Sequence, residues 1–369
     1  MVCIAAFIIL LVIGIVAALI SIFNRDFGHK YLALLKKSFH CFFKRVRLQK
    51  CDTNFSEDVK TTLLKKVVIK KPKLVKPLSI TIEIVSFALV ILTAWSIIEA
   101  AKAGLALWVF GTCNVSQPSN CALGAESCSI DENNLNWFTE WGEIFSNIPD
   151  RLKTWNAADY LNGSQALAPA SINGTGSDPA IAIIDPGCSV CLQSYKNLKA
   201  DADFLNKHTL YIISYPIHNP DGSLRFKNSE IITRYILATN NYQTRVANDF
   251  LGAEYDNPNK AAEKRNLIYG YSTKIIDRIF TQYDQNGVIY QSIFNDQLSN
   301  DEAAALLDSW LTEWGMTAEE LSSVQTEAYS ETVESTLRSN REIIDSSIKP
   351  KGIPTMIYDG KKHLGLYKK

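Results

Sequence analysis

The chain lacks net charge: its 369 residues include 38 Lys and Arg against 38 Asp and Glu. The balance hides an uneven distribution, because residues 24–77 carry 15 basic and 4 acidic side chains, a net charge of +11, and the remainder therefore carries −11. A nucleic-acid-binding domain is expected to be basic on the surface that it presents. Opposite charges in separate parts of the chain indicate two compartments instead, and we expect no nucleic-acid partner.

Charged residues are missing altogether from residues 1–23. A run of that length can cross the hydrocarbon core of a bilayer, about 30 Å thick, as a helix. A secretory signal peptide is the alternative, but it needs a basic first part, and no basic residue precedes Arg25. We therefore predict a retained transmembrane helix over residues 1–23 and, from a second apolar run, another over residues 78–100.

The basic loop at residues 24–77 lies between the two apolar runs. Cytoplasmic loops of membrane proteins collect Lys and Arg, so we expect this loop to face the cytoplasm. The chain is then a two-pass protein of the cell membrane, with its N-terminus and everything after about residue 100 outside the cytoplasm. We interpret the loop as a solvated linker; the alternative is an amphipathic segment that lies on anionic membrane lipid.

Regular periodicity is lacking in much of residues 101–179, which we interpret as an extracytoplasmic linker. Its part at residues 111–134 is rich in Ser, Asn and Gly, a composition typical of a loop. This part contains three cysteines, Cys113, Cys121 and Cys128. The apolar residues within 137–145 recur at helical spacing, which predicts one short amphipathic helix.

The remaining residues, 180–369, alternate between strand and helix signals. An apolar run at 180–184, a helix and a second apolar run at 209–217 predict a β-α-β unit with parallel strands. Asp359-Gly360 lies between two further short strands, the strongest short-range signal for a β-hairpin. The sequence therefore predicts an α/β domain.

A helical pattern fills most of residues 228–346, between the two halves of this domain. Two capping boxes mark helix starts, Ser299 with Glu302 and Thr317 with Glu320. We expect a long helical insertion that separates the β-α-β unit from the hairpin.

Two cysteines three positions apart, Cys188 and Cys191, follow the strand at 180–184. On a helix they share a face, where they can form a reversible disulfide. A zinc site would need two more ligands, and the sequence has no second Cys-x-x-Cys. This position within a β-α-β unit favours redox chemistry over a static disulfide or half of a metal site, and we expect no metal or organic cofactor.

The order of the two thiols predicts different roles. Cys188 lies at the N-terminus of its helix, where the helix dipole and free N–H groups favour the thiolate, so we expect Cys188 to attack. Cys191, one turn later, is expected to resolve the mixed disulfide. Asp185 precedes the helix and either caps it or handles protons; we favour the cap.

Four stretches of residues 180–369 have counterparts in one known family. They are IIDPGCSVC, the helical insertion, WLTEWGMTAEEL and KGIPTMIYDGKK. Together they resemble the DsbA-like branch of the thioredoxin superfamily. The resemblance implies a thioredoxin-like fold with a helical insertion, here preceded by two transmembrane helices, and the activity of a thiol–disulfide oxidoreductase.

The resemblance also implies the surroundings of the thiols. Ile353–Pro354 is expected to be a cis peptide bond that faces Cys188 and Cys191, with Thr355 directly after it. Backbone groups beside a cis proline can pair with an extended substrate. The implied partners are reduced or unfolded secreted proteins and a membrane quinone reductase of the DsbB or vitamin-K-epoxide-reductase type.

The chain departs from the family pattern near the thiols and at its end. Ser189 and Val190 stand between the cysteines, where this branch usually has proline first and the strongest oxidants have histidine second. Ala182 occupies the position of the buried acid of thioredoxin, and the chain ends at Lys369, where the family usually adds a helix. We expect a disulfide donor that is less oxidising than DsbA.

Two questions remain open from the sequence. Cys113, Cys121 and Cys128 form either one structural disulfide with a spare thiol or a relay pair that exchanges with Cys188. The whole chain is a membrane-anchored oxidoreductase, which we favour, or a non-enzymatic scaffold or assembly factor with a static disulfide. A metal chaperone is the third interpretation.

Overall fold

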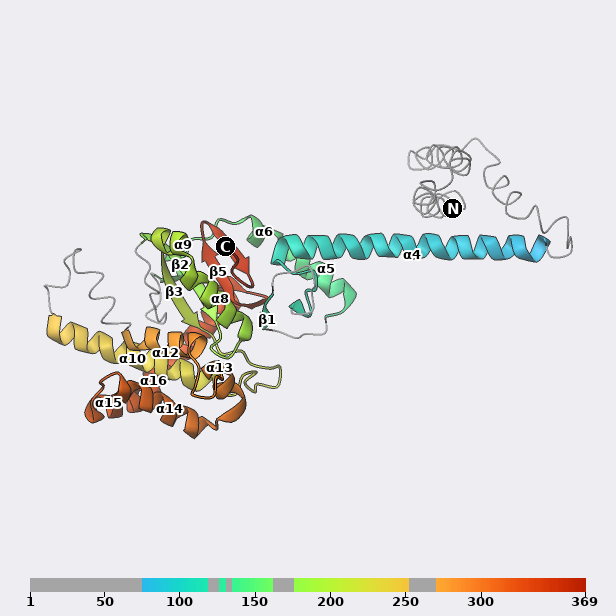
Figure 1. Cartoon of the computed structure of the whole chain (residues 1–369). Coiled ribbons are helices and arrows are strands. Elements are labelled where there is room, and N and C mark those ends of the chain that lie inside the picture. The colour runs from blue at the N-terminus through green and yellow to red at the C-terminus, as the bar shows by residue number, and fades with distance from the viewer. Residues whose placement is uncertain (1–74, 119–125, 131–134, 162–175, 252–269) are drawn as a thin grey trace, which may run out of the picture. The chain divides into compact units, whose positions relative to one another are not determined.

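The computed structural model describes residues 75–118, 126–130, 135–161, 176–251 and 270–369 (Figure 1). The chain divides into two compact units, Met1–Ala101 and Lys102–Lys369. The predicted first transmembrane helix and residues 24–74 of the basic loop lie outside the described residues. The last three residues of the predicted loop, 75–77, are helical instead.

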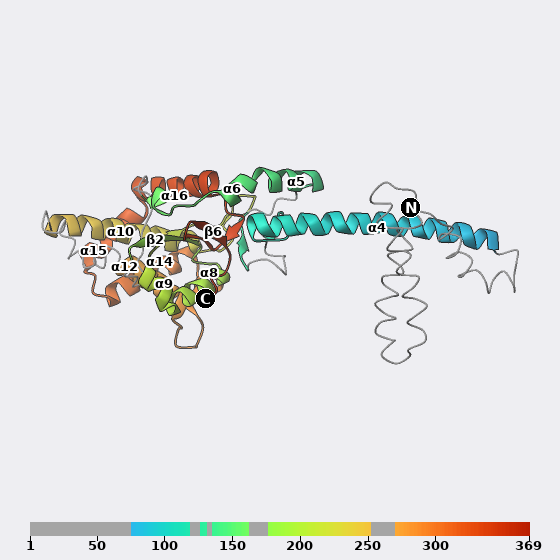
Figure 2. The same ribbon diagram turned by 90° about the horizontal axis from the view of Figure 1, so that it is seen from above.

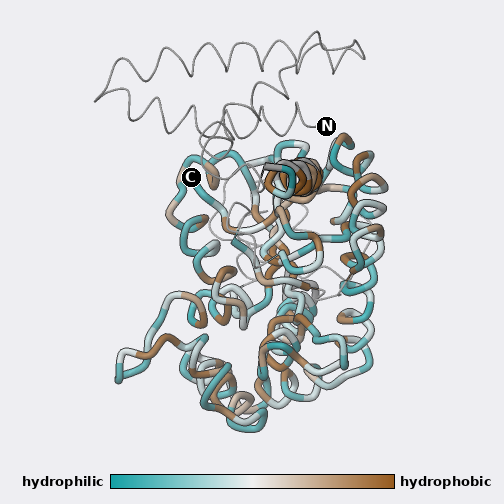
Figure 3. The backbone as a smooth tube through the Cα atoms, turned by 90° about the vertical axis from the view of Figure 1, so that its right-hand side faces the viewer, coloured by the Kyte–Doolittle hydropathy of each residue, from teal (hydrophilic) through white to brown (hydrophobic). Residues whose placement is uncertain are grey.

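The described part of the first unit consists of residues 75–101, which belong to helix α4, Val75–Phe110. Many of its large apolar side chains before residue 101 are exposed, Ile84 and Ile97 each by 64%. Figure 3, which looks along α4, shows its turns in the colour of hydrophobic residues. Within the described part of the chain, Ile91–Phe110 is the one stretch long and apolar enough to cross a membrane. It lies farther along the chain than the helix predicted at 78–100.

The last turns of α4 belong to the second unit and are packed there. Val109 shares a buried apolar cluster with Ile144 of α5 (Trp137–Ser146). The Lys102 ammonium pairs with the Glu140 carboxylate at 2.8 Å. Helix α5 is the amphipathic helix that the sequence predicted, and it holds the end of α4 on the domain.

Four strands form the main sheet, in the order β3-β2-β5-β6 (Figure 1). Strand β2 (Asp178–Ile184) runs parallel to β3 (His208–Ser214) and antiparallel to β5 (Thr355–Tyr358), which pairs with β6 (Lys361–Leu364). The last five residues of β2 are all buried, as expected of an apolar strand at the centre of a sheet. The predicted α/β class, β-α-β unit and final hairpin are confirmed.

The turn of this hairpin has the backbone that its sequence predicts. Asp359 and Gly360 have positive φ angles of 49° and 73°, as a tight two-residue hairpin turn requires. The Asp359 carboxylate also accepts a hydrogen bond from the Lys207 ammonium at 2.5 Å. The turn sets the register in which Tyr358 lies opposite Lys361.

Helices connect and cover the strands. Two of them, α8 (Ser189–Ala200) and α9 (Ala202–Lys207), join β2 to β3. Those of the insertion are α10 (Ser229–Leu251), α12 (Gly270–Thr281), α13 (Tyr290–Ser292), η5 (Ile293–Gln297), α14 (Asn300–Glu313), α15 (Ala318–Ala328), α16 (Glu331–Ile343) and η6 (Ile344–Ile348). Helix α10 packs against α12, α14, α15 and α16 (Figures 1 and 2). Both predicted capping boxes are present, at Ser299 and Thr317.

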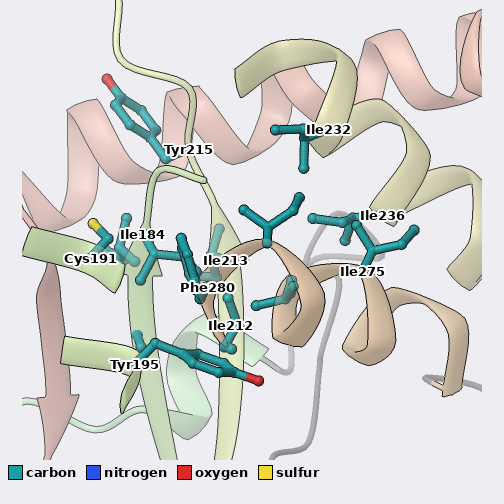
Figure 4. Close-up of a cluster of buried hydrophobic side chains, with 14 of the residues drawn as sticks. Ile184, Cys191, Tyr195, Ile212, Ile213, Tyr215, Ile232, Ile236, Ile275 and Phe280 are labelled. Atoms are coloured by element: carbon teal, nitrogen blue, oxygen red, sulfur yellow. The ribbon is translucent and has the colours of Figure 1, made fainter. Parts of the chain in front are cut away.

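The hydrophobic core lies between the sheet and the insertion (Figure 4). Ile184 of β2 and Ile213 of β3 meet Phe280 and Ile275 of α12 and Ile236 of α10. All five side chains are at most 3% exposed, and each contributes about 1.5 to 3 kcal/mol by its burial. This core fixes the C-terminal end of β2, from which the loop to Cys188 begins.

A short strand interrupts the loop that was predicted at residues 111–134. Strand β1 (Cys128–Ser129) pairs antiparallel with β4 (Gly352–Ile353), in a sheet of two strands. The loop prediction is wrong here, because two residues are too few to produce an alternating pattern. Their extended backbone depends on a partner far along the chain. The helices α6 (Ile148–Leu152) and α7 (Ala158–Leu161) follow α5.

Candidate active site

The loop at residues 185–187 connects β2 to α8 and places Cys188 at the N-cap of that helix. Cys188 has an extended backbone with φ −79° and ψ 121°. Its N–H donates to the Asp185 carbonyl at 3.1 Å, and its carbonyl accepts from the Leu192 N–H at 3.1 Å. Cys188 therefore precedes the helix, and Cys191 lies in the first turn. The N-terminal N–H groups of α8 still favour a thiolate at this end.

Cys188 is bonded to Cys128 and not to Cys191. The Cα atoms of the disulfide are 6.5 Å apart, across 60 positions of sequence. Cys191 is a buried free thiol. The expected Cys188–Cys191 disulfide is therefore absent, and Cys188 is bonded instead to the segment after α4. Cys128 is not a spare thiol. Cys113 is also in a disulfide, and Cys121 lies outside the described residues.

Cys128 meets Cys188 beside the proline loop, which we define as residues 352–355. Ile353–Pro354 is a cis peptide bond, as the resemblance implied, and Cys128 lies opposite Ile353 in the pair of β1 and β4. The Ile353 carbonyl oxygen is 3.8 Å from the Cys188 sulfur. The thiol, the proline loop and a paired strand that carries a second cysteine therefore meet at one place.

Thr355, the residue after the cis proline, closes this loop. Its hydroxyl donates to the Gly352 carbonyl at 2.7 Å, and the side chain is buried. Its backbone belongs to β5, where it lies opposite Ile183 of β2. Thr355 therefore ties the proline loop to the central sheet.

Asp185 is fully buried, and the expected helix cap is not formed. One carboxylate oxygen accepts from the Gly187 N–H at 2.7 Å and the other from the Ile217 N–H at 2.6 Å. No side chain caps α8 at Cys188, because the Asp185 carboxylate turns inward, toward the segment after β3. Burial raises the pKa of Asp185 to about 7, against the lowering effect of these hydrogen bonds.

Cys191 lies at the edge of the core, beside Ile184 (Figure 4). Burial raises the pKa of its thiol well above the ordinary value. The Asp185 N–H lies 3.4 Å from the Cys191 sulfur and lowers this pKa, whereas the negative charge of the Asp185 carboxylate raises it further. Cys191 therefore remains a thiol at neutral pH, as a resolving cysteine would.

Side chains of the helical insertion donate hydrogen bonds to the carbonyl groups of the reactive loop, residues 185–188. The Gln291 side-chain amide donates to the Pro186 carbonyl at 2.8 Å and to the Cys188 carbonyl at 3.0 Å. The Asn295 side-chain amide donates to the Gly187 carbonyl at 2.8 Å. Sequence reasoning missed both amides, because a single Gln or Asn within a helical pattern carries no signal of a distant partner.

Two further residues that the sequence did not reveal contact the site. An Arg225 Nη1 donates to the Ser129 carbonyl at 2.6 Å, and the Arg225 charge lowers the pKa of Asp185. Phe226 packs so closely on Gly187 that a Cβ there would lie 2.2 Å from the Phe226 Cβ. Glycine is therefore required at position 187.

No cluster of three or more His, Cys, Asp or Glu side chains within the described ranges could hold a metal ion. Three histidines of the described part have other surroundings: His208 is buried, the His218 Nδ1 lies 2.5 Å from an Arg341 nitrogen, and His363 stacks on Tyr358 with ring centroids 4.1 Å apart.

The likeness of this chain to known proteins is confined to solved structures. No model of a protein family matches it, and no curated protein matches it. Similar solved structures include the thiol–disulfide exchange protein α-DsbA2 of Wolbachia pipientis, with 12% identity, 57% of this chain and 87% of that chain covered, and a TM-score of 0.33. ScsC of Proteus mirabilis has 12% identity, 63% and 83% coverage and a TM-score of 0.33. The oxidoreductase NmDsbA1 of N. meningitidis has 16% identity, 54% and 80% coverage and a TM-score of 0.25.

Proposed function

We propose that this protein is a membrane-anchored thiol–disulfide oxidoreductase that donates disulfides to reduced secreted proteins. The observation that carries the proposal is the position of Cys188. It lies at the N-cap of α8, beside the cis Ile353–Pro354 bond, and is bonded to a cysteine on a strand that pairs with β4. A mixed disulfide between such an enzyme and an extended client would likewise join the attacking thiol to a cysteine on a strand that pairs with the enzyme.

The reaction begins with Cys188 and Cys191 joined in a disulfide. A client thiolate attacks the Cys188 sulfur, a mixed disulfide forms, and Cys191 leaves and takes up a proton. A second client thiolate then attacks the client sulfur of the mixed disulfide, so that the client departs with a new disulfide and Cys188 remains as a thiolate. Two electrons pass from the client to the cysteine pair. The N-terminal end of α8 stabilises the Cys188 thiolate.

We assign to Asp185 the role of supplying the proton that Cys191 takes up when it leaves. The carboxyl group is buried and its charge acts on the Cys191 thiol, and its pKa of about 7 allows it to gain or lose a proton near neutral pH. A carboxyl group exposed to water would keep its ordinary low pKa and could not exchange a proton in this pH range. The proton that Cys191 needs on leaving is thereby available inside the domain.

Trapping of clients tests this assignment. In a Cys128→Ala background, an added Cys191→Ala change removes the resolving thiol, so mixed disulfides between Cys188 and clients should accumulate. The matched pair Cys128→Ala with Cys188→Ala should trap none. Non-reducing electrophoresis of acid-quenched cells followed by mass spectrometry reads the adducts. Adducts on Cys191 instead of Cys188 would reverse the roles, and no adducts on either would refute the proposed function.

Membrane anchoring and orientation belong to the same proposal. The exposed apolar surface of α4 and the candidate span Ile91–Phe110 support an anchor. The basic loop supports an orientation with the domain outside the cytoplasm, where a quinone reductase of the DsbB or vitamin-K-epoxide-reductase type would reoxidise Cys188 and Cys191. An impermeant thiol reagent added to intact cells should miss Cys41 and Cys51 of that loop. Labelling of either would overturn the orientation.

A non-enzymatic scaffold is the second candidate, and one observation favours it. The Cys128–Cys188 disulfide occupies the attacking thiol, as a permanent structural bond would. Titration of the protein against glutathione buffers separates the two functions. A scaffold predicts that Cys188 resists the glutathione pool, whereas the enzyme predicts a reversible couple that contains Cys188.

A further inference from the structure

Residues 126–130 lie as an extended segment along the proline loop. The Glu126 carbonyl accepts from the Leu366 N–H at 2.8 Å, Cys128 and Ser129 pair with β4, and the Ile130 N–H donates to the Lys351 carbonyl at 3.4 Å. Backbone contacts therefore run along the whole segment. This is the pattern by which an extended peptide adds to the edge of a sheet.

Two residues of the domain are fitted to this segment. Gly352 has no side chain where a Cβ would lie 2.7 Å from the Ser127 hydroxyl and 2.9 Å from the Cys128 carbonyl. Arg225 donates to the Ser129 carbonyl at 2.6 Å from the other side. Ser127 and Ser129 are 5% and 0% exposed. The fit requires small residues on both sides of the cysteine.

The segment thus occupies the place that the proposed function assigns to a client, with a cysteine opposite Ile353 and bonded to Cys188. We propose that Cys128 is a third redox-active cysteine of this site: an internal client, which Cys191 displaces when the protein is to accept an external one. The inference rests on the proposed function, since it takes the exchange chemistry of Cys188 and Cys191 as given.

The displacement is an isomerisation that needs no oxidant or reductant. The Cys191 thiolate attacks the Cys188 sulfur, the bond between Cys188 and Cys128 breaks, and a bond between Cys188 and Cys191 forms. Cys128 leaves as a thiolate and takes up the proton that Cys191 has lost. The one free thiol of the three cysteines moves from Cys191 to Cys128, and the number of disulfides stays the same.

Two features of the structure fit this step. Cys191 is free and lies one helical turn beyond Cys188, at a spacing that can close a disulfide. Its high pKa keeps it protonated at neutral pH, so the bond to Cys128 persists until the Cys191 thiol ionises. While Cys128 stays bonded, residues 126–130 fill the edge of β4 and exclude an external client from it.

The position of the free thiol can be measured directly on the full-length chain in detergent micelles. N-ethylmaleimide in excess traps any thiol that becomes free, and peptide mass spectrometry identifies the site. In the wild type, Cys128 should become alkylated with time, leaving a disulfide between Cys188 and Cys191. The rate should rise about tenfold per pH unit between pH 6 and 8, because the thiolate of Cys191 is the attacking form.

Variants separate displacement from other routes to the same label. Cys191→Ala should leave Cys128 unalkylated, because nothing inside the site can displace it. Arg225→Met, which removes the hydrogen bond to the Ser129 carbonyl, should speed the labelling of Cys128 about tenfold. Arg338→Met is the matched control: this arginine is 62% exposed and pairs with the exposed Glu331, so the rate should not change.

Several results would overturn the inference. The wild type could show no alkylation of Cys128 after a day at pH 8, or Cys191→Ala could show the same rate as the wild type. An equal rate in Arg225→Met and the wild type would also count against it. Oxidation of a reduced dithiol peptide by Cys128→Ala is read separately. If Cys128→Ala oxidises the peptide while the wild type never releases Cys128, the internal client is refuted and the proposed function stands. If Cys128→Ala is inactive, the proposed function itself fails.

Discussion

Replacement of Asp185 by Asn should remove a pH dependence of stability that this one carboxyl group causes. The unfolded chain gives an aspartate its ordinary pKa of 3.8, and burial raises the pKa to about 7 in the folded protein. The folded state therefore holds the proton more tightly than the unfolded state. The stabilisation is fully present below pH 3.8 and is lost as the pH rises toward and through 7.

The size of the effect follows from the two pKa values. A shift of about three units corresponds to about 4 kcal/mol in all, at about 1.36 kcal/mol per unit. Between pH 5 and pH 8 the wild type should lose about 2 to 3 kcal/mol of its free energy of unfolding through this group. The side-chain amide of the Asp185→Asn variant cannot ionise. It also cannot accept from both the Gly187 and Ile217 N–H groups, which costs about 1 kcal/mol at every pH.

Urea unfolding of the full-length chain in detergent micelles, followed by tryptophan fluorescence, gives the free energies at the two pH values. The Cys128–Cys188 disulfide is verified in each sample. Other titrating groups are common to both proteins and cancel in the difference. Asp221→Asn is the control: Ser223 lowers the pKa of Asp221, so that group stays ionised from pH 5 to 8. An equal loss of stability in the wild type and Asp185→Asn would refute the raised pKa.

Three further predictions concern Val190, Gly187 and Gly352. Val190→His should raise the reduction potential by a few tens of millivolts, from a wild-type value between about −270 and −120 mV, because one hydrogen bond to the thiolate is worth about 1.5 to 3 kcal/mol; equilibration with glutathione measures it, and a fall would contradict the reasoning. Gly187→Ala should lower the free energy of unfolding by about 1 to 3 kcal/mol, because its Cβ would meet Phe226 at 2.2 Å; a Phe226→Gly background should reduce the loss. Gly352→Ala should lower the fraction of chains with Cys128 bonded to Cys188, because the new Cβ would lie 2.9 Å from the Cys128 carbonyl; an unchanged fraction in disulfide mapping would show that the close approach is dispensable.

The parts of the fold that the sequence predicts are those with local signals. The apolar run of β2, the Asp359-Gly360 turn and the capping boxes at Ser299 and Thr317 each act within a few residues. Their backbone conformations therefore follow from the residues themselves. The cis bond before Pro354 has no such signal and came from resemblance alone.

The disulfide of the site depends on tertiary contacts and could not be predicted in this way. Cys128 lies 60 positions before Cys188, and the described residues around it, 126–130, contain a strand of two residues. A spacing of three between Cys188 and Cys191 pointed to the local pair. The inward turn of Asp185 had the same cause, since its partner Ile217 lies beyond β3. Local rules favoured the helix cap there.

The reactive loop depends on side chains that lie far away in the sequence. Gln291 and Asn295 follow the carbonyl groups that they bind by 103 to 108 positions. A Cys-x-x-Cys segment moved from this chain into a smaller scaffold would leave those carbonyls to water or to new donors, and the first thiol would have a different orientation. The side-chain amides of Gln291 and Asn295 are thus as necessary to the site as the sulfur atoms. The smallest unit that carries this chemistry is the assembled domain.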